Sequence, residues 1–216
     1  MMAKFVRKEP ANKHDAVTFY FSVDHTLNYT AGQFTELTLD KVGRHWFTLS
    51  SAPGKAEFTI TTRLTGSDFK NALDSLKPGD EIYAADSMGD FVLPIDSSRP
   101  ILMVAGGIGI TPFYSILQDL HKKNSSLYKL HLLYIASSKE DFLDLSKYKD
   151  LLVSYKEIIG RVESSDILKD ASALSDPYIY TSGPEPMVEK IVSDLKAAGI
   201  PEDSLVSDYF PGYSYE

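Results

Sequence analysis

The stretch that decides the fold lies at residues 101–120 and reads ILMVAGGIGITPFYSILQDL. Its first five residues form an apolar run without polar alternation, which predicts a strand buried on both faces of a parallel sheet. A glycine-rich turn comes next at 106–109, and Thr111 and Pro112 then suit the N-cap and the first position of a helix. We expect the backbone N–H groups at the start of this helix to face the turn, an arrangement that suits a pyrophosphate.

The glycine-rich turn alone does not decide a function. It departs from the dinucleotide fingerprint G-x-G-x-x-G, because Thr111 and Pro112 stand where a third glycine would fall. Glycines after a strand also serve as a simple tight connection, which is the alternative interpretation. The remaining motifs of the chain have to separate the two.

Composition excludes several classes of protein. The 216 residues, 43% of them hydrophobic, suffice for one large domain or two small ones, and the net charge of −8 argues against nucleic acid as the main partner. Without cysteine the chain has no disulfide, no thiol catalysis and no cysteine-ligated metal or iron–sulfur centre. No apolar run is long enough to span a membrane and the first residues lack a signal-peptide pattern, so we expect a cytoplasmic protein.

Up to residue 97 the sequence predicts β structure. Its β-branched and aromatic residues concentrate in short segments between turn-forming ones, and one short helix is expected at 68–76. About six strands of this length are typical of a small antiparallel Greek-key β barrel. The expected strands are 16–23, 33–39, 46–51, 57–63, 81–85 and 91–93.

From residue 98 onward, strands and helices alternate. Such alternation predicts a parallel sheet flanked by helices, with ligands bound outside the carboxyl ends of its strands. We therefore expect two domains, a six-stranded β barrel at 1–97 and an α/β domain at 98–216. The expected strands of the second domain are 101–105, 129–135, 157–159, 178–181 and 205–210, and its expected helices are 112–122, 141–152 and 185–198.

Four segments of the first domain resemble the flavin-binding motifs of the ferredoxin–NADP reductase superfamily. RHWFTLSS at 44–51 resembles R-x-Y-[ST]-x-x-S, in the H-x-F-T-L-S-S form of the NADPH oxidase and ferric reductase branch. GQF at 32–34 resembles the segment that precedes this motif, and GDF at 89–91 resembles the segment that closes the barrel. Residues 66–73 resemble the segment that binds the flavin phosphates.

Three segments of the second domain resemble the nucleotide-binding motifs of the same superfamily. GGIGITP at 106–112 resembles the nucleotide loop, SGP at 182–184 with Met187 resembles C-G-P-x-x-M, and DYF at 208–210 resembles the terminal E-x-F. The seven segments keep the order of the superfamily over almost the whole chain, and that order makes the resemblance specific.

The resemblance implies a function. A flavin-binding barrel domain and an NAD(P)-binding α/β domain would move a hydride from NADPH to FAD, with NADH as the alternative donor. Single electrons would then pass to a separate acceptor such as a ferredoxin, haem, quinone or ferric complex. This acceptor is a protein, a membrane-bound redox partner included, or a small molecule, and no metal is expected. The alternative is a catalytically weak nucleotide-binding regulatory module of a larger electron-transfer complex, which the departures at His45, Ser182 and Asp208 keep open.

The resemblance implies three catalytic side chains. Thr48 would offer its hydroxyl to N5 or O4 of the flavin, Ser182 stands in place of a cysteine beside the nicotinamide, and Asp208 stands in place of a glutamate that relays a proton to N5. The plainer interpretations are an ordinary barrel threonine for Thr48 and the N-cap of the next helix for Ser182.

The resemblance also implies the residues that bind the two cofactors. For FAD they are Arg44, His45, Trp46, Phe47, Thr48, Thr61, Thr62, Arg63, Phe69, Lys70 and Phe210. For NAD(P) they are Gly106, Gly107, Gly109, Ile110, Thr111, Pro112, Ser137, Ser138, Lys139, Ser182, Gly183, Pro184 and Met187.

The choice of nucleotide depends on the residues just after the second strand of the α/β domain. Ser137, Ser138 and Lys139 supply two hydroxyls and a cation, which favours the 2′-phosphate of NADPH. An acidic side chain there would instead bind the free ribose hydroxyls of NADH. Glu140 and Asp141 come next, so NADH remains the alternative.

Overall fold

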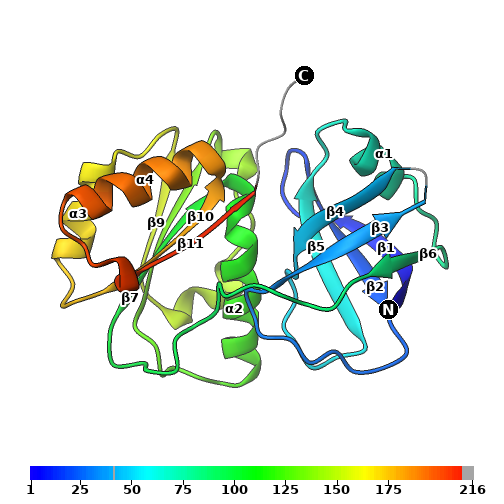
Figure 1. Ribbon diagram of the computed structural model, residues 1–216, viewed down its shortest axis with the longest axis horizontal. Helices are drawn as coiled ribbons and strands as arrows, with labels where there is room; N and C mark the ends of the chain where they lie inside the picture. Colours follow the sequence, from blue (N-terminus) through cyan, green and yellow to red (C-terminus); the bar gives the residue numbers. More distant parts are fainter. Residues whose placement is uncertain (41, 211–216) are drawn as a thin grey trace.

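The computed structural model describes residues 1–40 and 42–210, without the side chain of Phe210 (Figure 1). Two sheets organise it. One is six-stranded and antiparallel, in the order β4-β3-β6-β1-β2-β5, and the other is five-stranded and parallel, in the order β11-β10-β7-β8-β9. This architecture confirms the predicted fold class. The first sheet and its helix comprise β1 (Met2–Pro10), β2 (Ala16–Ser22), β3 (Phe34–Leu39), β4 (Gly43–Thr48), β5 (Glu57–Arg63), α1 (Asp68–Asp74) and β6 (Glu81–Ala84).

The antiparallel sheet curls back on itself just after β4. Leu49 forms a β-bridge with Ile60 of β5, and the Ser50 N–H donates to the Thr59 carbonyl at 2.8 Å. Because side chains alternate between the two faces of a strand, each strand sends every second residue into the barrel. The fully buried core residues are large and apolar, among them Phe19, Phe21, Leu37, Phe58 and Ile60.

Two predictions for this half were wrong. Strand β1 was not expected, because its sequence MAKFVRKEP is largely charged; only Ala3 and Phe5 are buried, and pairing with β2 and β6 holds the strand in place. The expected strand at 91–93 is absent from the described structure. Phe91 instead packs edge-on against Phe113 and Tyr180 of the other half, so this segment serves as an anchor between the two halves.

The parallel sheet is covered by helices on both faces. Every residue of the central strand β7 (Ile101–Gly106) is buried, as its unbroken apolar run predicts. Its Ile101, Met103 and Ala105 share one core with α2 (Thr111–Lys122), and Leu102 and Val104 share another with α3 (Ser164–Ser172) and α4 (Glu185–Ala197). The other strands are β8 (Leu130–Ala136), β9 (Leu152–Ile159), β10 (Tyr178–Pro184) and β11 (Leu205–Phe210), and the 3₁₀ turns are η1 (Gly107–Ile110), η2 (Lys139–Asp141), η3 (Ser146–Leu151) and η4 (Glu202–Ser204).

The segment between β8 and β10 differs from the expectation. In place of a helix at 141–152 there are two 3₁₀ turns, separated by an extended stretch that buries Leu143 and Leu145 beside α2. Strand β9 begins at Leu152 and not at 157. Its first residues were not predicted as a strand because they are polar or exposed at the edge of the sheet. Helix α3 was not expected either, since its nine residues bury only Ser164, Ile167 and Ala171.

Helix α2 stands between the two sheets and joins them (Figure 1). From this helix, Ser115 Oγ donates to the Ser51 carbonyl at 2.6 Å, Gln118 Nε2 to the Ser50 carbonyl at 2.6 Å, and Lys122 Nζ to the Pro53 carbonyl at 2.9 Å. These bonds hold α2 against the barrel. None of the helices formed by the described residues is long and apolar enough to cross a membrane.

Candidate functional site: two adjoining clefts

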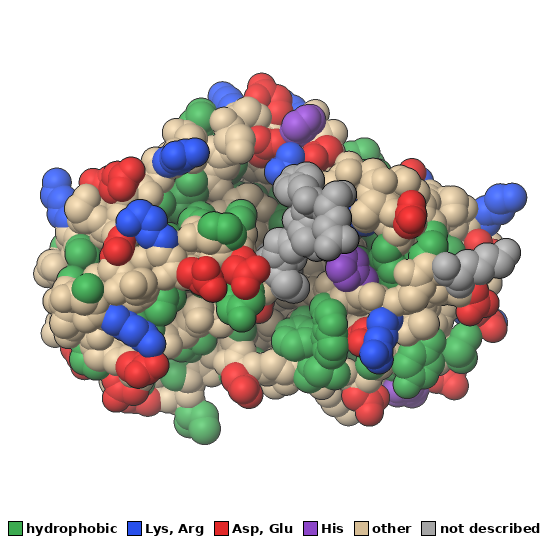
Figure 2. Space-filling model, turned by 45° about the horizontal axis from the view of Figure 1, so that its top comes forward, with side chains coloured by type: hydrophobic (Ala, Val, Ile, Leu, Met, Phe, Trp, Pro, Cys, Tyr) green, Lys and Arg blue, Asp and Glu red, His purple; other side chains and the backbone are tan. Residues whose placement is uncertain are grey.

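Two hollows meet where the barrel faces the carboxyl ends of the parallel strands, and Figure 2 shows the surface sunken between the two halves. The barrel cleft, of ≈ 330 Å³, is lined by Phe34, His45, Trp46, Phe47, Thr48, Thr61, Thr62, Lys70, Met88, Ile108, Thr111, Asp208 and Tyr209. The strand-end cleft, of ≈ 150 Å³, is lined by Asn12, Ala16, Arg63, Gly106, Gly107, Ile108, Ile135, Ala136, Ser137, Asp141, Gly160, Pro184 and Met187. Ile108 lies in the wall of both clefts, so they adjoin.

Thr48 occupies the end of β4 in the wall of the barrel cleft. Its side chain is almost fully buried, and its Oγ1 atom has no hydrogen-bond partner. A core threonine normally bonds to a nearby backbone carbonyl, as Thr35 Oγ1 does to Ala85. The free hydroxyl of Thr48 is therefore available to a group that enters the cleft.

Ser182 lies near the end of β10, where it pairs with Ala105 of β7 on one side and with Asp208 of β11 on the other. It is fully buried and its Oγ atom also lacks a partner. The interpretation of Ser182 as a helix N-cap is wrong, because the N-cap residue of α4 is Pro184 and no side chain caps this helix.

Among the described residues, Thr48 and Ser182 carry the two buried side-chain polar atoms without a partner. A buried polar group left unpaired costs roughly 1–3 kcal/mol, which makes such atoms rare and in need of an explanation. One comes from the barrel and the other from the parallel sheet. Both are positions that the motifs assign to catalysis. A ligand in the barrel cleft would give the Thr48 hydroxyl a partner, whereas Ser182 lines neither cleft and lies beside Asp208, which lines the barrel cleft.

Asp208 is the third predicted catalytic residue and lines the barrel cleft. Parallel register places it beside Ser182, so their side chains share one face of the sheet. Burial raises the pKa of the Asp208 carboxyl to about 6. This carboxyl can hold or release a proton near neutral pH, as a proton relay requires.

Lys70 and His45 are the two basic side chains in the wall of the barrel cleft. Lys70 is almost fully buried, and burial together with the charge of Arg63 lowers the pKa of its ammonium to about 8. Burial and the neighbouring Lys70 lower the pKa of His45. Burial disfavours the charged form of both groups, and an anion bound beside them would stabilise that form. This is the chemistry expected of residues that hold a phosphate.

The structure brings most, not all, of the predicted FAD residues to the barrel cleft. Trp46, Phe47, Thr61 and Thr62 line it together with Thr48, His45 and Lys70, although Thr61 Oγ1 is already bonded to Thr18 and Ser50. Phe210 lies outside the part of the chain whose side chains are described.

Three other predicted FAD residues lie elsewhere. Arg44 is exposed on the outer side of β4, where its Nη1 is 3.8 Å from Oε1 of Glu36. Phe69 is buried behind His45 and Phe47. Arg63 lines the strand-end cleft instead, because the long strand β5 runs from one cleft to the other.

The strand-end cleft lies at the carboxyl ends of β7, β8, β9 and β10, the place where open parallel sheets bind ligands. Its wall includes Gly106 and Gly107 from the turn after β7, Ser137 after β8, and Pro184 and Met187 at the start of α4. These five are predicted NAD(P) residues.

The glycine-rich turn requires glycine for two different reasons. Gly107 has φ of 53° and open space around the position of a Cβ, so its backbone is exposed to the cleft. A Cβ on Gly109 would lie 2.4 Å from the Ser182 carbonyl oxygen, so only glycine lets the turn approach β10 this closely. Gly109, Ile110, Pro112 and Gly183 thus shape the cleft from behind rather than lining it.

The end of β8 is arranged differently from the prediction. Ser138 donates from its N–H and its Oγ to Asp141 Oδ2 at 2.9 and 3.0 Å, and this capping box closes η2. Ser138 and Lys139 do not line the cleft, whereas Asp141 does. Thr111 begins α2 in place of capping it, and its hydroxyl donates to the Ile108 carbonyl at 3.0 Å.

Sequence reasoning missed the contribution of the turn between β1 and β2. Asn12 lines the strand-end cleft, and its Nδ2 donates to the Asp141 carbonyl at 3.0 Å across 129 positions of sequence. No local signal marks such a contact, since it depends on how two domains pack.

Comparison with known proteins finds relatives among reductases. Residues 99–167 match the family model described as the ferric reductase NAD binding domain. The reductase component of propane 2-monooxygenase from Rhodococcus jostii is 25% identical over 99% of this chain, which covers 64% of that protein. The chain therefore spans less than two thirds of the length of this curated relative.

Two solved structures share the fold. A cytochrome P450 reductase from Amycolatopsis superposes with a TM-score of 0.83 at 21% identity, covering 99% of this chain and 70% of the other. Ferredoxin–NADP⁺ reductase from Plasmodium falciparum superposes with a TM-score of 0.80 at 16% identity, covering 97% and 95%. The chain therefore has the two-domain fold of the ferredoxin–NADP reductase-like structures, and its residues 99–167 match the ferric reductase NAD binding domain.

Proposed function

We propose that the protein binds FAD in the barrel cleft and a nicotinamide nucleotide in the strand-end cleft, and that it passes electrons from the nucleotide to a separate acceptor. One observation carries the proposal. Two buried hydroxyls without a partner come from the two different domains: Thr48 Oγ1 lines the barrel cleft, and Ser182 Oγ belongs to the strand neighbour of Asp208, which lines the same cleft. Bound FAD supplies hydride acceptance from the nucleotide and one-electron release to the acceptor.

The residues of the barrel cleft fit a flavin. The cleft volume of ≈ 330 Å³ falls within the usual range for small-molecule sites, about 300–1,000 Å³. Its walls combine aromatic side chains such as Phe47 with the hydroxyl of Thr48, the ammonium of Lys70 and the imidazole of His45. Planar rings, hydrogen-bond acceptors and phosphates of a flavin dinucleotide each find a matching group.

The chain's own side chains have distinct tasks in this proposal. Thr48 donates a hydrogen bond to the polar edge of the flavin ring, and Ser182 orients the nicotinamide from the side of the parallel sheet. Asp208 holds a proton beside the ring at pH values near its pKa of about 6. The backbone of the turn at 106–109 and the start of α2 receive the pyrophosphate of the nucleotide.

For the nucleotide, the geometry favours NADH over the NADPH favoured by the sequence pattern. The carboxylate of Asp141 lines the strand-end cleft, whereas Lys139 is exposed outside it and Ser138 is engaged in its capping box. A carboxylate at this place accepts hydrogen bonds from a free ribose diol and repels a 2′-phosphate.

The acceptor is proposed as a separate protein. The relative from Rhodococcus jostii is the reductase component of propane 2-monooxygenase, and the Amycolatopsis structure is a cytochrome P450 reductase. This chain itself has no cysteine to ligate an iron–sulfur cluster. A ferredoxin or a haem protein would fit this role, and a quinone or a ferric complex is the small-molecule alternative.

Purification of the protein tests the proposal. We expect a yellow protein whose flavin absorption bleaches when NADH or NADPH is added without oxygen. The alternative, a regulatory module without turnover, predicts a colourless protein that takes up no added FAD and still binds the nucleotide.

A further inference from the structure

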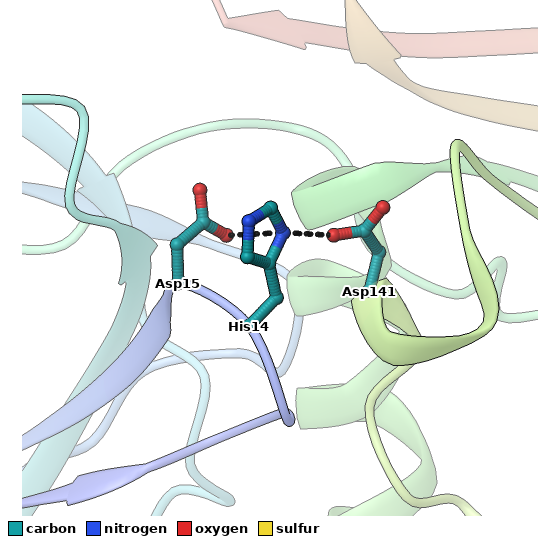
Figure 3. A group of neighbouring side chains, drawn as sticks. All are labelled: His14, Asp15 and Asp141. Atoms are coloured by element: carbon teal, nitrogen blue, oxygen red, sulfur yellow. Dashed lines mark hydrogen bonds and ion pairs between the residues drawn. The ribbon is translucent and has the colours of Figure 1, made fainter.

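A turn of the barrel reaches across to the α/β domain beside the strand-end cleft. Besides the bond from Asn12, the Lys13 N–H donates to the Glu140 carbonyl at 3.2 Å. His14 Nδ1 lies 2.7 Å from Asp141 Oδ1, and Figure 3 shows the imidazole held between Asp15 and Asp141. A side chain of one domain thus bonds directly to the carboxylate that lines the cleft of the other.

This contact limits what Asp141 can offer a ligand. Ser138 already donates twice to Oδ2, and His14 meets Oδ1. A carboxylate has roughly four lone-pair positions, so about one is left for a ribose that carries two hydroxyls. His14 therefore fixes both the direction of the Asp141 carboxylate and its remaining capacity to accept hydrogen bonds.

The charges around His14 are balanced in pairs. Facing it are Asp141 from η2, Asp15 from its own turn at 3.9 Å, and Arg63 from β5, whose Nε is 2.8 Å from Asp15 Oδ2. Arg63 compensates Asp15, which leaves His14 and Asp141 as the second pair. The four side chains therefore form an ion-pair bridge between the two domains.

His14 is placed to change its charge near neutral pH. Its side chain is 58% exposed, so it exchanges protons with solvent freely. The hydrogen bond with Asp141 raises the pKa of His14 above its ordinary value, and the neighbouring Asp15 adds to this. Below that pKa the pair with Asp141 is neutral overall, and above it the carboxylate keeps an uncompensated charge.

We propose that His14 is a positioning residue for the nucleotide, and that its protonation sets how strongly the strand-end cleft distinguishes a 2′-hydroxyl from a 2′-phosphate. The inference rests on the proposed function of this cleft. With His14 protonated, the cleft tolerates a 2′-phosphate because Asp141 is compensated. With His14 neutral, Asp141 repels the phosphate and accepts hydrogen bonds from the hydroxyl.

The test measures binding and needs no turnover. Calorimetric titration gives the dissociation constants of 5′-AMP and of adenosine 2′,5′-bisphosphate with the purified protein between about pH 5.5 and about pH 8.5, a range that spans histidine titration. We expect the preference for 5′-AMP to rise about fivefold or more with pH in the wild type, as for roughly 1 kcal/mol of charge coupling. In His14→Gln, the preference for 5′-AMP should change with pH only through the titration of the 2′-phosphate itself. In His14→Lys, the preference should stay near the low-pH value of the wild type.

His25→Gln is the matched control, because His25 also pairs with an aspartate, Asp24, at 2.6 Å on the barrel surface, and it lies away from both clefts. This variant should behave like the wild type. If the preference for 5′-AMP changed with pH in the same way in the wild type and in His14→Gln, the inference would be wrong and the proposed function would stand. Binding of neither nucleotide would overturn it together with the proposed function, whereas selectivity that depends on His14 without any flavin reduction would overturn only the proposed function.

Discussion

The two clefts of this protein are built in contrasting ways. The barrel cleft is lined mainly by side chains of neighbouring strands, and four consecutive residues of β4, from His45 to Thr48, contribute to it. The strand-end cleft is formed by backbone at the ends of four strands, by glycines, and by a turn of the other domain. The first cleft offers specific hydroxyls and basic side chains, whereas the second offers a particular shape and a balance of charged groups. Substitutions should therefore act through chemistry in one and through packing in the other.

The largest effect is expected at the packing of the strand-end cleft. Gly109→Ala would place a Cβ 2.4 Å from the Ser182 carbonyl oxygen, so the turn has to move away from β10. Overpacking of this kind costs typically 1–3 kcal/mol, and displacement of the turn should lower nucleotide affinity by about a hundredfold or more. Thermal unfolding and nucleotide titration measure the two effects.

Gly107→Ala is the control for this substitution, since a Cβ there meets open space and only the positive φ is strained. It should lose about 1 kcal/mol of stability, the usual cost of a left-handed backbone at a non-glycine residue. Equal losses of nucleotide affinity in the two variants would contradict the role of Gly109 in the close approach.

Thr48→Val tests the chemistry of the barrel cleft. Removal of a hydroxyl that serves the flavin ring should slow flavin reduction by about ten- to a hundredfold, in the range for a lost transition-state hydrogen bond. The protein without flavin should keep its stability or gain some, because the hydroxyl has no partner to lose. Thr38→Val, on the neighbouring strand β3 and outside the cleft, should change neither the rate nor the flavin content.

Lys70→Met should weaken FAD binding by about tenfold, through loss of one charge–phosphate contact. The pH dependence has a defined sign. Lys70 in the free protein is charged below its pKa of about 8 and neutral above it, so FAD affinity should fall as pH rises through this value. In Lys70→Met this fall should be absent, and fluorescence titration with FAD at several pH values would show a persistent fall if another group were responsible.

Asp208→Asn should have the smallest effect at pH 7 and alter the pH profile instead. Burial holds the pKa of the carboxyl at about 6, above its ordinary value, so the carboxyl is mostly protonated below pH 6 and mostly ionised above it. A change in the rate of flavin reduction around that pH in the wild type should disappear in the variant. An unchanged profile would remove Asp208 from the proton relay.

The contrast between the clefts also explains which site residues could be predicted from the sequence. Motifs that consist of consecutive residues predicted the barrel cleft and the turn after β7, because a strand or a turn fixes the relation of neighbouring side chains. Arg44 does not line the cleft, although Trp46 and Thr48 on the same face of β4 do, because its side chain is exposed near Glu36. Asp141 and His14 are 127 positions apart, and their meeting depends on domain packing that no local pattern encodes.

Secondary structure shows the same division. The buried strand β7 and the helix α2 were predicted within one residue, because unbroken apolar and helical periodicities are strong signals. The prediction for the stretch from 141 to 152 was wrong because Leu143 and Leu145 belong to an extended segment and Tyr148 to the 3₁₀ turn η3, all of which pack in the same core as α2. The burial that tertiary contacts supply there outweighs local helix propensity.

The most direct test is anaerobic rapid mixing of the FAD-loaded protein with NADH that carries deuterium at the transferred position of nicotinamide C4. It measures whether the ligands of the two clefts react with each other. We expect that the flavin is reduced, that deuterium slows this reduction, and that Thr48→Val slows it further. Tight binding of FAD and NADH without any reduction of the flavin would show that the adjoining clefts do not serve hydride transfer.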